Sequence, residues 1–383
     1  MTTFRELVDT SRVIICAGSG GVGKTTTAAV LAIDAARAGR RAVVVTIDPA
    51  KRLADALGLP ELAPDPVVID PAHWSRDDSR PGGRLSAMML DPKVTFDALV
   101  ARHAADEAQA TRILENGFYR TISSALGGTQ EYMAMEKLHE LHEDGDFDLI
   151  VIDTPPSRHA LDFLDAPERL LRLLENRVFR VLITPARTGL RIAGVAVQAL
   201  VRTASRVIGT EVVDDIVAFF RAFEGMEEGF RARARRVRVV IAAPTTTFVL
   251  VTSPRRDAVL EAEYFAQAIG DHGYRVAGLV VNRVHPQFGA ERGDALHARA
   301  AAMRALPRAD AGVTAARHRL ADRLETLGDL QEVAARERRH LEGVRMRLGT
   351  GAAVAFVAFL PHDVHDVEAL DAIARRLLDE DGS

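Results

Sequence analysis

The residues with the clearest chemical potential form a short glycine-rich stretch near the N-terminus. Residues 18–25 read GSGGVGKT and match the pattern G-x-x-x-x-G-K-[ST] at every defined position. In such a loop, backbone N–H groups and the following helix N-terminus face phosphate oxygens. Lys24 is then expected to pair with the β and γ phosphates and Thr25 to ligate Mg²⁺. The stretch therefore predicts a site for a nucleoside triphosphate and Mg²⁺.

A second candidate is the carboxylate at the end of the apolar segment DLIVID. Asp153 closes this segment and is followed by Thr-Pro-Pro. A carboxylate placed there could reach Mg²⁺ directly or through a water molecule. Asp153 could instead only cap the end of the strand. The presence of a phosphate loop in the same sequence favours the role in metal binding.

Two further carboxylates lie in the segment TIDPAKRLADALG. Asp48 ends an apolar run, and Asp55 follows seven residues later, so both could face the phosphates if the chain bends at Pro49. One carboxylate would assist the metal while the other, Asp55, orients the attacking water. Asp55 could instead be a solvated helix residue.

Seven short apolar runs that could position these residues alternate with helical patterns. The runs are apolar throughout, which is typical of strands buried on both faces of a sheet. We expect an α/β fold with a mostly parallel, doubly wound sheet of the P-loop NTPase type and helical insertions that form a helical subdomain. The predicted strands begin at Arg12, Arg41, Leu85, Asp148, Thr247, Val276 and Ala353.

Three intervals are too long to be simple crossovers between strands. They cover about residues 94–145, 157–243 and 290–348, and their amphipathic pattern predicts helices. Because strands recur after each interval, a single domain over residues 1–383 is expected, with the intervals as insertions.

Composition limits the classes of partner. The chain has 383 residues and a formal net charge of −4, which does not favour nucleic acid. Cys16 is the only cysteine and lies in an apolar run, so a buried strand residue is expected there, and a CxxC zinc site is excluded. With neither a signal peptide nor a long uncharged apolar stretch visible, we predict a cytoplasmic protein, possibly held at a membrane by a partner.

The phosphate loop GSGGVGKT, the segment TIDPAKRLADAL and the segment DTPPSRHALDFL together resemble the ArsA-type ATPases. This family includes the arsenite-pump ATPase and the targeting ATPase for tail-anchored membrane proteins. The resemblance continues through TTFVLVTSPRRDAVLEAE, GLVVNRV and FLPHDVHDVEAL, covers most of the chain and is weakest in the helical insertions.

The resemblance implies roles for individual residues. Asp48 and Asp153 match the magnesium sphere, Asp55 the water-orienting carboxylate, and His159 the histidine of the second switch. Asn282 and Pro361 match positions that contact adenine, so ATP is favoured over GTP. The phosphate contacts are expected from Gly20, Gly21, Val22, Gly23, Lys24, Thr25 and Thr26.

This sequence departs from the family pattern in two ways. Ser19 stands where related loops carry a lysine that reaches the phosphates of a dimer partner, and a serine cannot supply that charge. Lys51 and Arg52 are the nearest substitutes. The cysteines that the family uses for zinc or metalloid are absent, so neither ligand is expected.

The resemblance implies a Mg²⁺-dependent ATPase that rearranges a homodimer, or a heterodimer with a paralogous ATPase, and handles a client or membrane protein. Apolar stripes in residues 190–209 and 212–220 could form a client surface or pack on each other. The rival hypothesis is a non-hydrolysing, nucleotide-gated scaffold subunit of a heterodimer. A DNA-partition or membrane-oscillating ATPase is disfavoured because the C-terminus is acidic.

Overall fold

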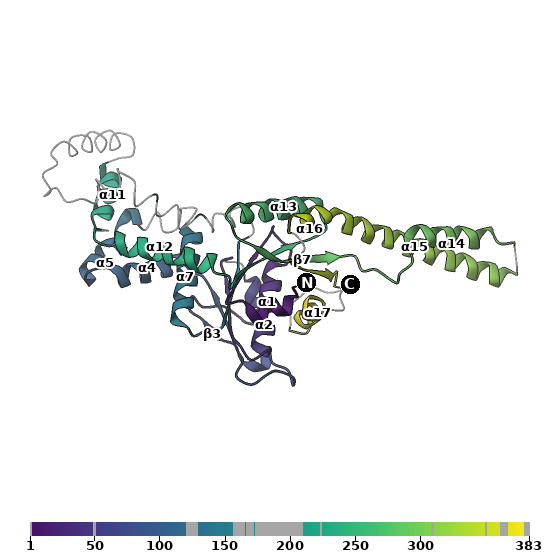
Figure 1. Ribbon diagram of the computed structural model, residues 1–383, viewed down its shortest axis with the longest axis horizontal. Helices are drawn as coiled ribbons and strands as arrows, with labels where there is room; N and C mark the ends of the chain where they lie inside the picture. Colours follow the sequence, from purple (N-terminus) through teal and green to yellow (C-terminus); the bar gives the residue numbers. More distant parts are fainter. Residues whose placement is uncertain are drawn as a thin grey trace.

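The centre of the molecule is an eight-stranded sheet in the order β3-β4-β2-β5-β1-β6-β7-β8 (Figure 1). The computed structural model describes residues 2–48, 51–119, 129–155, 165, 172, 210–222, 224–307, 310–348, 351–360 and 367–378. The strands are β1 (Val13–Ala17), β2 (Arg41–Thr46), β3 (Val67–Val68), β4 (Arg84–Met89), β5 (Leu149–Asp153), β6 (Thr246–Thr252), β7 (Val276–Val284) and β8 (Ala353–Ala358).

All seven predicted strands are present, and every neighbouring pair among them is parallel. Strand β3 was not predicted; it is a two-residue antiparallel edge strand on β4, and both of its valines are exposed. The expected mostly parallel α/β fold is therefore confirmed.

Helices cover both faces of the sheet, which explains why its strands are apolar throughout. Val13 and Ile15 of β1 belong to one buried cluster, while Ile14 and Cys16 belong to another on the opposite face. Most helical residues of the second cluster come from α1 (Phe4–Thr10), α2 (Lys24–Arg37), α3 (Arg52–Ala56) and α17 (Val367–Leu378). The buried Cys16 matches the expectation of an inert strand residue, and burial raises the pKa of its thiol.

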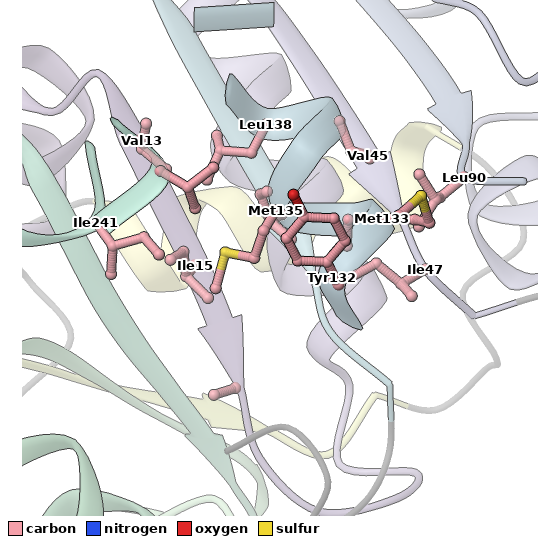
Figure 2. Packing of buried hydrophobic residues seen from close by; sticks show 14 of the residues in the cluster. Val13, Ile15, Val45, Ile47, Leu90, Tyr132, Met133, Met135, Leu138 and Ile241 are labelled. Carbon is pink, nitrogen blue, oxygen red and sulfur yellow. The ribbon is translucent and has the colours of Figure 1, made fainter. Parts of the chain in front are cut away.

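The first cluster is formed by helices on the other face. The helices α7 (Thr129–Asp144), α12 (Glu227–Ala242) and α13 (Arg256–Asp271) contribute to it. Figure 2 shows Tyr132, Met133 and Met135 of α7 lying beside Ile15 and Ile47. The insertion that contains α7 is thus anchored on the sheet by its own apolar face.

The first two predicted insertions meet in one helical lobe at one end of the molecule (Figure 1). The lobe contains α7, α12, α4 (Pro92–His103), α5 (Glu107–Leu114) and α11 (Thr210–Ala222). The ring of Phe219 on α11 stacks with that of Tyr119, 6.2 Å between centroids, and Phe219 is buried. Phe219 of the predicted client stripe 212–220 therefore packs within the lobe, whereas residues 190–209 lie outside the described residues.

The third insertion forms a separate hairpin at the opposite end of the molecule (Figure 1). It consists of α14 (Gly293–Ala305) and the 30-residue helix α15 (Ala311–His340), which pack along each other. The chain then returns through α16 (Glu342–Leu348), which packs on α13. A short 3-10 helix, η1 (Pro71–His73), lies between β3 and β4. In the described part of the chain, no helix combines the length and the apolarity that crossing a membrane requires.

Candidate nucleotide-binding site

The predicted phosphate loop connects β1 to α2, at the carboxyl end of a central strand. Gly23 precedes the first residue of α2 and has a φ of 100°, a conformation that disfavours any residue with a side chain. A Cβ atom on Gly18 would lie 2.0 Å from the backbone oxygen of Val251 in β6. Both glycines are therefore required by the backbone path, which points the N-terminus of α2 at the loop.

Lys24 is the first residue of α2, and its side chain turns back over the loop. Its ammonium donates to the backbone oxygen of Ser19 at 2.8 Å, and the residue is only 6% exposed. Burial lowers the pKa of Lys24, while Asp153 and Asp48 act in the opposite direction. An ammonium has three donors, so the remaining N–H groups can serve phosphate oxygens.

Asp153 lies at the end of β5, between the ends of β1 and β2. Its Oδ2 accepts hydrogen bonds from the hydroxyls of Thr25, at 2.7 Å, and Thr46, at 3.0 Å. Its Oδ1 is buried and has no hydrogen-bond partner among the described residues. Burial, the largest effect, raises the pKa of this carboxyl, while the two hydroxyls and Lys24 lower it.

These donors fit a magnesium ion. A buried carboxylate oxygen without a partner is costly unless a ligand satisfies it. Mg²⁺ prefers oxygen ligands, and Thr25 can keep donating to Asp153 while its own oxygen offers a lone pair. Thr25 and Asp153, with Asp48 nearby, are therefore suited to hold Mg²⁺.

Residues of the segment TIDPAKRLADALG, which we call the first switch, line one cavity together with residues of the phosphate loop. Asp48 accepts from Arg52 at 3.0 Å, and its backbone N–H donates to the Thr46 hydroxyl at 3.3 Å. Asp55, in the short helix α3, is exposed and also lines the cavity. Of the two substitute cations named from the sequence, Arg52 lines the cavity. Lys51 is not among its lining residues.

The cavity has a volume of about 470 Å³, within the range typical of small-molecule sites. It brings together eight of the predicted site residues from three separate segments of the chain. They are Gly21, Gly23, Lys24, Thr25, Thr26, Asp48, Asp55 and Asn282.

Asn282 connects the far wall of this cavity to the phosphate loop. Its Nδ2 donates to the Val22 backbone oxygen at 2.9 Å, and its Oδ1 accepts from the backbone N–H of Arg283 at 2.9 Å. Arg283 has a φ of 60° and lies where the register between β7 and β8 shifts. Among the described residues, it is the only one other than glycine with a positive φ. The strand end is therefore bent around the Asn282 amide.

A second cavity, of about 570 Å³, adjoins the outer side of the loop. Ser19, Gly20 and Val22 line this second cavity and are not among the residues that line the first. Ser19 is 9% exposed, and its hydroxyl has no hydrogen-bond partner in the described structure. Arg283 and Phe359 line both cavities and form part of their shared wall.

Two predicted residues cannot be placed: His159 and Pro361 lie outside the described residues. Leu360, next to Pro361, does line the first cavity. Thr46 was missed by sequence reasoning, although it joins Asp153 to the first switch. In the sequence, Thr46 is recognisable only as a hydroxyl residue at the end of a strand. Its contact with Asp153 depends on the pairing of these two residues across β2 and β5.

Comparison with known proteins relates this chain to a family of ATPases. The family described as anion-transporting ATPase matches residues 11–306. The chain is 26% identical over 273 residues to the ATPase get3 of Schizosaccharomyces japonicus, covering 71% of this chain and 74% of that protein. It is 25% identical over 271 residues to the ATPase GET3A of Arabidopsis thaliana, covering 71% and 66%.

A shorter match reaches higher identity. The ATPase GET3 of Chaetomium globosum is 30% identical over 174 residues, which is about half of each chain, at 45% and 48%. The family match includes the phosphate loop, both segments that supply carboxylates, and Asn282, and it covers well over half of the sequence. The chain therefore belongs to the ArsA-type family of anion-transporting ATPases.

Proposed function

We propose that this protein binds Mg²⁺-ATP and hydrolyses its β–γ anhydride. The observation that carries the proposal is the Asp153 carboxylate, which holds the hydroxyls of Thr25 and Thr46 on one oxygen and keeps the other buried and unpartnered. Without a bound cation, the buried and unpartnered carboxylate oxygen would destabilise the folded protein.

The phosphates would lie against the start of α2. Backbone N–H groups of the loop and the Lys24 ammonium would face the β and γ phosphates, where their charge favours the transition state. When bound, Mg²⁺ neutralises part of the charge that develops on the transferred phosphoryl group. Thr25, Asp48 and Asp153 would hold it.

Asp55 is the residue we assign to the attacking water. Its carboxylate lines the cavity from an exposed turn of α3, in reach of solvent, while Asp153 is buried. The two carboxylates therefore suit different tasks: an exposed one can exchange and orient a water molecule, and a buried one can hold a metal.

The rival function is a non-hydrolysing, nucleotide-gated scaffold. Ser19 favours it, since the loop lacks the lysine that related proteins donate to a partner. Arg52 favours hydrolysis, because it places a guanidinium in the same cavity and is paired with Asp48 at 3.0 Å. We place ATP turnover ahead of the scaffold on this ground.

A single-turnover assay separates the two functions. Purified protein is mixed with substoichiometric labelled ATP and Mg²⁺, and phosphate release is followed for wild type, Asp55→Asn and the exposed-loop control Asp77→Asn. We expect slow release, lost in Asp55→Asn and unchanged in the control. Binding of ATP without release in any of the three proteins would establish the scaffold instead.

We also propose that the active assembly is a dimer, homotypic or with a paralogous ATPase, whose arrangement follows the nucleotide and which handles a client or membrane protein. The family relationship and the second cavity beside Ser19 support this proposal. Native mass measurement with ATP and Mg²⁺, with subunits identified, tests it; a monomer under both conditions would contradict it.

A further inference from the structure

The hairpin of α14 and α15 carries an unpartnered apolar ridge far from the nucleotide site. Leu306, Val313 and Leu320 are 50%, 42% and 44% exposed. Val313, Leu320 and Leu327 are seven residues apart, so they share one face of α15. We call Leu306, Val313, Leu320 and Leu327 the apolar ridge.

Charged side chains are distributed unevenly around this ridge. Arg319 and Arg323, one helical turn apart, flank it on one side, and neither guanidinium has a hydrogen bond or ion pair within the described part of the chain. Arg317 donates to the Pro307 backbone oxygen at 3.0 Å on the other flank. The exposed edge of α15 is therefore apolar and cationic.

Three acidic residues of α15, Asp322, Glu325 and Asp329, lie on the opposite side of the helix and contact basic side chains of α14. Arg304 of α14 binds Asp322 at 2.7 Å and Glu325 at 2.5 Å. The Nε2 atom of His297 on α14 lies 3.0 Å from Oδ1 of Asp329, which can accept a hydrogen bond from the ring. The two helices thus use their acids for packing against each other and leave free arginines beside the ridge.

We propose that this edge of the hairpin docks onto an anionic lipid surface. A helix with leucine and valine on one face and flanking arginines is suited to lie in the interface of a charged bilayer. A second copy of the chain is a less favourable occupant, because it would bring a second pair of free arginines to the same apolar face.

The hairpin is also separate from the features that define the family. The family match ends at residue 306, before α15 begins. The ridge is built almost wholly on that helix. Lipid docking can therefore fail while ATP binding stands, and the two proposals are tested independently.

The test is sedimentation of the full chain with vesicles. We expect binding to vesicles of phosphatidylcholine mixed with phosphatidylglycerol, little binding to pure phosphatidylcholine, and weakening as salt rises. The double variant Arg319→Glu/Arg323→Glu should bind at least about tenfold more weakly. Val313→Ser/Leu320→Ser, which keeps both arginines, should also lose binding.

The matched control is Arg375→Glu/Arg376→Glu, which reverses two exposed arginines of α17. It should bind vesicles like wild type, and all variants should keep the wild-type melting curve and Mg²⁺-ATP affinity. Equal binding to neutral and anionic vesicles, or equal losses in control and ridge variants, overturns the proposal. A ridge variant that changes the native mass of the protein without changing vesicle binding would instead make the ridge a subunit contact.

Discussion

The side chain of Asn282 braces the phosphate loop by donating from Nδ2 to the Val22 backbone oxygen at 2.9 Å. The family resemblance assigns this asparagine to adenine, and its amide retains one N–H for that purpose. The structure adds a second role, because the same amide ties the end of β7 to the loop that would hold the phosphates.

Asn282→Ala is predicted to weaken the binding of both Mg²⁺-ATP and Mg²⁺-tripolyphosphate about fivefold, the loss of roughly one hydrogen bond. A residue that acted only on adenine would affect ATP alone. Titration calorimetry with both ligands measures the difference. The control is Asn116→Ala, which removes a side-chain hydrogen bond to the Asp215 backbone oxygen in the helical lobe. It should leave the affinity for both ligands unchanged.

Gly23→Ala is predicted to abolish ATP binding, for two separable reasons. Its φ of 100° disfavours a side chain, and the new Cβ would lie 2.2 Å from the Asn282 amide nitrogen. The double variant with Asn282→Ala removes the contact but keeps the strain, so binding should return only in part. Gly82→Ala has a φ of 88° with no atom within 4 Å of the new Cβ, and should leave ATP affinity unchanged. Full recovery in the double variant would show that the contact alone matters.

Asp153→Asn is predicted to stabilise the nucleotide-free protein while removing Mg²⁺-ATP binding. Burial raises the pKa of Asp153 above its unfolded value, so the folded state binds the proton more tightly. The unfolding free energy therefore decreases as pH rises from the usual Asp range through the raised pKa. The variant should lack this contribution and be more stable by about 1 kcal/mol or more at neutral pH.

Urea unfolding at several pH values, with and without Mg²⁺-ATP, tests this prediction. Wild type should gain stability on ligand addition and the variant should not. If Asp153→Asn is less stable than wild type at neutral pH, the prediction is wrong, and the charge of the Asp153 carboxylate is already compensated by its neighbours.

Arg52→Ala is predicted to slow single-turnover phosphate release by at least about tenfold, because it removes a guanidinium from the nucleotide cavity. Lys51→Ala should leave the rate unchanged.

Ser19→Lys should raise the rate of phosphate release, both in the wild-type protein and in Arg52→Ala, if a missing cation limits hydrolysis. An unchanged rate in Ser19→Lys would mean that the absent lysine was never limiting.

Arg233→Met is predicted to destabilise the helical lobe by about 3 kcal/mol or more. Arg233 of α12 pairs with Glu136 of α7, and both residues are buried. Losing the arginine leaves a buried carboxylate, whose pKa burial already raises. Adding Glu136→Gln to the variant should recover much of the loss in urea unfolding, since it removes the unpaired charge. No recovery would identify lost packing as the cause.

The features that could be predicted from the sequence are those that depend on the pattern of neighbouring residues in the chain. Seven strands were recognisable because each is a continuous apolar run, although the edge strand β8 alternates buried and half-buried residues. Strand β3 has only two exposed valines and no such run. Lys24, Thr25 and Asp153 were recognisable from motif and strand end. Their hydrogen bonds to Ser19 and Thr46 were not, because these depend on how the loop folds back and which strands are neighbours.

The course of the third insertion could not be predicted for a related reason. Its helical period is clear, yet period alone does not say whether a helix returns to the sheet or extends from it. The first two insertions converge because their apolar faces meet, while α15 has its buried residues mainly toward α14.

The length of α15 has a mechanical consequence. Its 30 residues span about 45 Å at the usual helical rise. Near its base, Glu337 holds both the backbone N–H and the ring of His285, two residues beyond Arg283 at the wall of the nucleotide cavity. A rotation of only about 5° at that base moves the far end by about 4 Å. The hairpin is therefore a lever that would turn small changes beside the nucleotide into displacements as large as an atom at its tip.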